Sequence, residues 1–144
     1  MPKFIADFFP NVANYWDIFL TALTATYQMF FIAGLITLLI GGAFGISLIV
    51  TKTDGIKPNR IIHFILEVIT NVFRAVPFII LLIFLIPLTR SIAGTSIGVK
   101  GAVVPLVFGA VPFYTRQVET ALADVNPGKI EAARSMGSST QIGR

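Results

Sequence analysis

Few residues of this 144-residue chain are of types that carry out acid–base, nucleophilic or metal chemistry. There are no cysteines and one histidine, His63, which excludes a thiol nucleophile, a cysteine metal site and a histidine cluster. A Gly-Lys-Ser/Thr phosphate loop is missing, so the chain is not predicted to hydrolyse ATP itself. No catalytic residue, cofactor or metal is therefore predicted. Five of the seven acidic residues are scattered across different predicted elements, which indicates solvated or paired charges and not a metal cage: Asp54, Glu67, Glu119, Asp124 and Glu131.

Two pairs of oppositely charged residues are spaced so that each pair lies on one face of a helix. Glu67 and Arg74 lie seven residues apart inside an apolar region, and so on one face of a helix. Two interpretations of Arg74 stay open. Its side chain extends to the membrane interface, or it pairs inside the assembly, because intramembrane charges usually face protein or water. Arg116 and Glu119 have i,i+3 spacing, which predicts a pair.

The stretch 131–137 is polar and helix-forming in an otherwise apolar chain. It follows an Asn-Pro-Gly turn at 126–128, which ends one helix and lets another begin. Gly137 is placed to end a helix of about two turns as a left-handed cap. So short a helix is not stable alone, which predicts that it docks against the membrane helices or a partner. Glu131, Ala132, Ala133, Arg134 and Met136 have good helix propensity, and Gly137 follows them as the cap.

The composition predicts an all-α integral membrane protein that positions this stretch. Hydrophobic residues make up 55% of the chain and charged residues 12%, with a mean hydropathy of +0.83. A soluble domain carries roughly a quarter charged residues. The net charge is +4, but the Lys and Arg residues flank apolar runs. Orientation in the bilayer explains them better than nucleic-acid binding does.

Three transmembrane helices are predicted, at about 18–51, 61–89 and 101–123. Residues 18–51 carry no charge, and about 20 residues suffice to cross the hydrocarbon core. Pro77 and Pro87 predict a helix start or kink at each position. Gly41 and Gly45 form a small-xxx-small spacing, where another helix packs closely. That neighbour is left unspecified, and a dimer seam is an alternative.

The distribution of cations predicts the orientation. Lys52, Lys57, Arg60, Lys129, Arg134 and Arg144 fall on one side of the predicted spans, and Lys3, Arg90 and Lys100 on the other. Because cytoplasmic loops carry the excess of Lys and Arg, residues 1–17 are predicted to form an external interfacial segment. Residues 124–144 are predicted to form a cytoplasmic loop.

Several segments resemble a known family. The run 71–82 (Asn-Val-Phe-Arg-Ala-Val-Pro-Phe-Ile-Ile-Leu-Leu), the segments 86–90 and 94–98, and Glu-Ala-Ala followed by Gly137 are similar to permease subunits of bacterial ATP-binding-cassette importers. They are most similar to methionine importer permeases. Permeases for polar amino acids usually have Arg-Gly-Thr-Pro where this chain has Arg-Ala-Val-Pro at 74–77.

The resemblance implies a function, with partners. The chain is expected to be a multi-pass permease subunit of the plasma membrane, in which residues 131–137 form the coupling helix that docks on a separate cytoplasmic ATPase. A second permease copy, an external substrate-binding lipoprotein and membrane lipid are the other expected partners. A polar amino-acid permease and a non-transporting membrane scaffold are the alternatives.

The resemblance also implies an incomplete type I importer permease fold. The family pattern continues past Gly137 to Ile-x-Leu-Pro and further spans, whereas this chain ends at Arg144. A truncated copy or a fragment of a permease is therefore expected.

Overall fold

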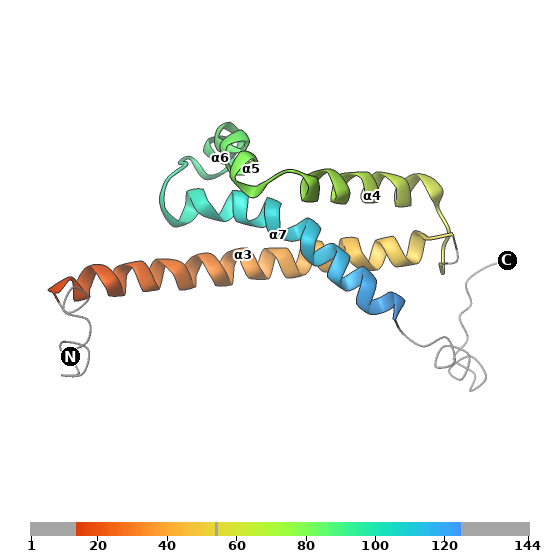
Figure 1. The fold of residues 1–144 in the computed structure, drawn as a ribbon, viewed down its shortest axis with the longest axis horizontal. Coiled ribbons are helices and arrows are strands. Elements are labelled where there is room, and N and C mark those ends of the chain that lie inside the picture. Colours follow the sequence, from red (N-terminus) through yellow and green to blue (C-terminus); the bar gives the residue numbers. More distant parts are fainter. Residues whose placement is uncertain (1–13, 54, 125–144) are drawn as a thin grey trace.

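A computed structural model of the chain describes residues 14–53 and 55–124, and within them every regular element is a helix. The elements are α3 (Trp16–Thr51), α4 (Arg60–Ala75), α5 (Phe78–Phe84), α6 (Ile86–Ala93) and α7 (Gly98–Ala123). Figure 1 shows α3 running along the length of the molecule, with α4, α5 and α6 on one side of it and α7 crossing it. Helix α7 contacts each of the other four helices.

Helix α3 is formed by the long uncharged run near the N-terminus. Its 36 residues correspond to about 54 Å at 1.5 Å per residue, longer than a hydrocarbon core of about 30 Å. Three exposed hydroxyl groups of α3 are satisfied within the helix: Thr21, Thr24 and Thr26 each donate to the carbonyl four residues earlier. Because these hydroxyls need no outside partner, the helix surface presented to lipid stays effectively apolar.

The region 61–89 is divided into α4, α5 and α6, with breaks at the two prolines. Val76 has extended backbone angles (φ −81°, ψ 123°), as expected for a residue before proline. Pro77 then precedes α5, and the α4 and α5 axes differ by 104°. Pro87 lies in the first turn of α6, a position that proline tolerates. The helix boundaries predicted from Pro77 and Pro87 are thus found, and the first is a sharp bend.

Helix α7 begins three residues before the predicted span and continues through both of its prolines, Pro105 and Pro112, which are buried. In Figure 1 the ribbon of α7 changes direction between its teal N-terminal half and its blue C-terminal half. The two prolines are seven residues apart, about two turns, and so lie on the same face. Missing hydrogen bonds on one face account for a bend in one sense.

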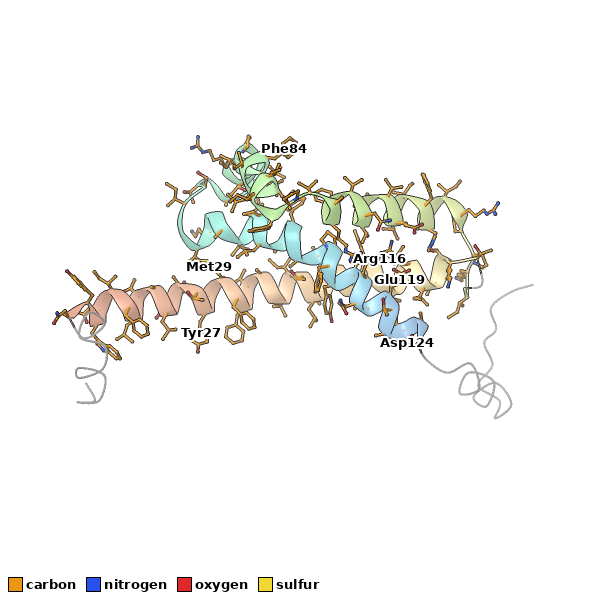
Figure 2. The ribbon with its side chains drawn as sticks, in the orientation of Figure 1. Tyr27, Met29, Phe84, Arg116, Glu119 and Asp124 are labelled. Carbon is orange, nitrogen blue, oxygen red and sulfur yellow. The ribbon has the colours of Figure 1, made fainter. Side chains whose placement is uncertain are left out.

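Large apolar side chains point away from the protein on most of the surface. Phe84 is 79% exposed and Phe30 68%, and Figure 2 shows Phe84 projecting outward from α5. Among the described helices, α3 and α7 are long and apolar enough to cross a bilayer, and α4 with α5 forms a bent third candidate. This inside-out distribution is expected when the outer surface faces lipid and not water.

Candidate functional site

The predicted coupling residues lie outside the described part of the chain. Glu131, Ala132, Ala133, Arg134, Met136 and Gly137 all follow the last described residue, Asp124. What the structure describes is the helix that leads to them, since α7 ends at Ala123 with Asp124 as its C-cap. Figure 2 shows Asp124 at the end of α7, beyond Arg116 and Glu119 on the same helix.

Gly41 and Gly45 lie where α3 crosses α7. A Cβ added at Gly41 would stand 2.9 Å from Cδ1 of Tyr114 and 3.2 Å from the Val111 carbonyl oxygen. A Cβ added at Gly45 would stand 2.6 Å from Cβ of Val118 and 2.8 Å from the Thr115 carbonyl oxygen. The neighbour that the spacing left open is therefore α7 of the same chain.

The buried face of α3 repeats small residues at four-residue spacing. Ala33, Thr37, Gly41 and Gly45 are buried, and Leu48 completes the row with no exposed surface. Small side chains bring helix backbones close enough for extensive van der Waals contact, which drives helix association in lipid. Helices α3 and α7 thus form a closely packed pair.

Glu67 pairs with α7 and not with Arg74. One Glu67 carboxylate oxygen lies 3.5 Å from Nη2 of Arg116, and the other lies 3.8 Å from Nε2 of His63. Arg74 is exposed and has no ion-pair or hydrogen-bond partner among residues 14–53 and 55–124. Positions 67 and 74 share a face, but they are about 10 Å apart along the helix axis, too far for direct contact.

Arg116 binds groups on two helices. Its Nη1 donates to Oε2 of Glu119 one turn later on α7, and its Nη2 donates to Oδ1 of Asn71 on α4 at 2.9 Å. The predicted Arg116–Glu119 pair is confirmed. The planar guanidinium presents donors in several directions, so one side chain serves both α4 and its own helix.

His63 extends these contacts to α3. Its Nδ1 lies 3.1 Å from the Leu48 carbonyl oxygen, near the C-terminal end of α3, and donates to that oxygen in the tautomer protonated at Nδ1. We call His63, Glu67, Asn71, Arg116 and Glu119 the Arg116 cluster. It links α3, α4 and α7.

Sequence reasoning did not find the Arg116 cluster. It named Glu67 and placed it on one helical face with Arg74, but it identified no partner for Glu67 and gave no role to Asn71. The spacing of His63, Glu67 and Asn71 at i, i+4 and i+8 was the available signal, because it predicts one polar stripe along α4. Helix α4 turns this stripe toward α7, whereas Ile61 (72% exposed) and Phe64 (66% exposed) face outward.

The chemistry of the Arg116 cluster is charge pairing. Both carboxylates contact Arg116, and in the described part of the chain no three His, Cys, Asp or Glu residues are placed to hold a metal ion. The side chains of Arg116 and Glu119 are 21% and 18% exposed, against 43% for Glu67. Partial burial reduces screening of these pairs by solvent; the contacts of Arg116 with Glu67 and Asn71 join α7 to α4.

A cleft and a cavity flank α4. The cleft, of about 660 Å³, lies between the end of α3 and the first half of α4; Thr51, Asn59, Arg60, His63 and Glu67 contribute to its lining. The cavity, of about 200 Å³, is lined by apolar residues of α3, α4 and α7: Ile40, Phe44, Ile69, Phe73, Val107, Phe108, Val111 and Pro112. Helix α4 is thus less closely packed on its neighbours than α3 is on α7.

An all-helical apolar bundle, whose last described helix ends shortly before the stretch predicted to dock, is the architecture expected of a transport-system membrane subunit. The chain belongs to the family described as binding-protein-dependent transport system inner membrane component, which it matches over residues 43–141.

Individual relatives agree with the family. The chain is 46% identical over 113 residues to the D-methionine transport system permease protein MetI of Yersinia pestis, covering 78% of this chain and 52% of the relative. It is equally similar to MetI of Escherichia coli K12, with 46% identity over 113 residues and the same coverage. A probable MetI of Vibrio cholerae is 42% identical over 122 residues, or 85% of this chain and 54% of the relative. The chain spans about half the length of the curated relatives that it matches.

Solved structures of the MetNI methionine ABC transporter in inward-facing conformations share the fold. One matches with a TM-score of 0.75 at 44% identity, over 82% of this chain and 55% of the solved chain. A second crystal form matches with a TM-score of 0.77 at 43% identity, over 84% of this chain and 56% of the solved chain. At 43–44% sequence identity, the similarity indicates a shared family and not only a shared fold.

Proposed function

We propose that this chain is part of the transmembrane permease of an ATP-driven importer for methionine. The observation that carries the proposal is its match to the MetNI methionine transporter, with 44% identity and a TM-score of 0.75 over 82% of the chain. The relatives named D-methionine transport permeases support the same substrate class. The permease is not itself an enzyme in this proposal, because ATP is hydrolysed by a separate subunit.

The proposed partners are two cytoplasmic ATPase subunits, a second permease copy and an external substrate-binding lipoprotein. Residues 131–137 are proposed to dock on the ATPase as a short helix, with Ala132 and Ala133 at the contact. This placement is supported by α7, which ends at Ala123, a short distance in sequence before the docking stretch. A rigid helix leading to a docking site transmits displacement better than a flexible loop does.

The proposed orientation places the N-terminus outside and the 131–137 stretch in the cytoplasm of a bacterial cell. It is supported by three cations where α3 connects to α4: Lys52 and Lys57 lie between the helices, and Arg60 is the first residue of α4. Cytoplasmic loops carry the excess of positive charge. Asn59 caps α4 at this end by accepting from the backbone N–H groups of Ile61 and Ile62.

Uptake by the assembled transporter tests the proposal. The intact permease that contains this chain is reconstituted in liposomes with its ATPase and its binding protein, and uptake of labelled methionine is measured with ATP inside. We expect ATP-dependent uptake that excess unlabelled methionine suppresses and that excess arginine or glutamine leaves in place. Equal suppression by all three would favour a general polar amino-acid permease. ATPase binding without uptake of any of them would favour a membrane scaffold.

A further inference from the structure

The α3–α7 pair and α4 are held together in different ways. Gly41 and Gly45 bring the α3 backbone against α7 so closely that an added Cβ would lie within 3 Å of α7 atoms. The contacts between α4 and α7 include the Arg116 cluster and an aromatic contact, Phe73 with Phe108, whose ring centroids are 5.8 Å apart. The 200 Å³ cavity lies between these three helices. Close packing favours movement of α3 and α7 as one body, whereas α4 has one buried residue, Thr70, against five in α7.

Position along the chain gives the Arg116 cluster a mechanical role. Arg116 lies about two turns before the end of α7 at Ala123, and α7 leads toward the stretch proposed to dock on the ATPase. Its partner Asn71 lies about one turn before the end of α4, next to the 104° bend into α5. The cluster therefore joins the end of α7 that receives movement to the end of α4 that precedes the bend.

We infer that Arg116 is the positioning residue through which movement of α7 reaches α4 and the α4–α5 bend; this inference rests on the proposed function. The guanidinium holds Glu67 and Asn71 on α4 while Glu119 fixes its orientation on α7. An arginine does this where a lysine does not, because its planar fork keeps several donors in a set geometry. When α7 is displaced, α4 follows as long as these contacts hold.

The measurement is the number of ATP molecules hydrolysed per methionine imported by the reconstituted transporter. Arg116→Gln and Glu67→Gln are expected to raise this ratio by roughly 3- to 30-fold, the range in which residues within coupling networks act. Arg116→Lys is expected to fall between Arg116→Gln and the wild type. ATPase association should be unchanged, because the Arg116 cluster lies within the membrane subunit. Gln117→Ala, at an exposed neighbouring position on α7, is the matched control and should have the wild-type ratio.

Chemical cross-linking distinguishes a role of Arg116 in transmitting movement from a role in stability alone. The chain has no cysteine, so a Glu67→Cys, Arg116→Cys double variant can be joined by a short bifunctional thiol reagent. Before linking, the double variant should have a raised ratio; after linking, the ratio should return toward that of the wild type. A normal ratio in Arg116→Gln, or a ratio unchanged by linking, would overturn the inference. Wild-type transporter that imports no methionine would instead contradict the proposed function, so the two failures are distinguishable.

Discussion

Val118 on α7 lies directly over Gly45 on α3, so close that a Cβ added at Gly45 would stand 2.6 Å from the Val118 Cβ and 2.7 Å from its Cγ1. The Thr115 carbonyl oxygen closes the same space at 2.8 Å. Backbone atoms cannot move aside as the end of a flexible side chain can. The absence of a side chain at Gly45 therefore sets the closest approach of the two helices.

Gly45→Ala is expected to weaken the packing of α3 on α7 by about 1–3 kcal/mol, because added volume at a filled site forces the helices apart. The same replacement raises helix propensity by about 1 kcal/mol, which offsets part of the loss in packing. Gly42→Ala is the matched control, since no atom lies within 4 Å of a Cβ at that position. The measurement is the thermal unfolding midpoint of the purified permease in detergent. A midpoint for Gly45→Ala at or above that of Gly42→Ala would contradict the packing described here.

Gly94 ends α6 in a left-handed conformation with φ 73°. Its added Cβ would meet no atom within 4 Å, so a substitution there reports backbone strain alone. Gly94→Ala is expected to destabilise the α6–α7 connection by about 1–2 kcal/mol. Gly94→Asn should cost less, because asparagine tolerates this conformation better than alanine does. Amide hydrogen exchange in α6 measures both variants, and equal exchange in Gly94→Ala and the wild type would rule out the strain.

The orientation is tested by single cysteines in a chain that has none. Lys57→Cys lies in the connection between α3 and α4, and Ile97→Cys lies between α6 and α7 at a position 82% exposed. A membrane-impermeant thiol reagent added to intact cells should label Ile97→Cys. The same reagent should label Lys57→Cys only after the cells are lysed. Lys57 is chosen within this connection because the nearby Asn59 caps α4, and replacing Asn59 would disturb that helix. Labelling of Lys57→Cys in intact cells would reverse the proposed orientation.

The docking stretch is tested by adding bulk at its small residues. If residues 131–137 insert into a cleft on the ATPase, Ala133→Trp is expected to weaken association by about 1–3 kcal/mol, since packed contacts tolerate added volume poorly. Insertion of the permease into the membrane should be unaffected. The readouts are co-purification of the ATPase and substrate-stimulated hydrolysis, with Thr140→Trp as a control of equal bulk outside the stretch. Wild-type values for Ala133→Trp would leave 131–137 as an ordinary connector.

Residue patterns predicted the helices and helix breaks that depend on a single stretch of chain. The uncharged run at 18–51 predicted α3 nearly to its observed ends, Trp16 and Thr51. Pro77 and Pro87 predicted breaks that are found beside them. These features depend on local causes, namely the length needed to cross a bilayer and the missing N–H and fixed φ of proline. The family could also be recognised from the sequence, because short motifs such as 71–82 resemble those of known permeases.

Contacts between elements were accessible only in part. Gly41 and Gly45 predicted a close neighbour but not that the neighbour is α7, and the size of the bend at Pro77 could not be derived from the residue itself.

The sequence by itself determined that this is an apolar, helical membrane protein, because composition and local spacing suffice for that, and its resemblance to known permeases indicated the family. Only the tertiary structure decided that Glu67 pairs with Arg116 and not with Arg74, and that Asn71 joins them. The physical reason is that periodicity places a side chain on a face of its own helix. Which helix lies on that face, and at what height along it, depends on how distant segments pack.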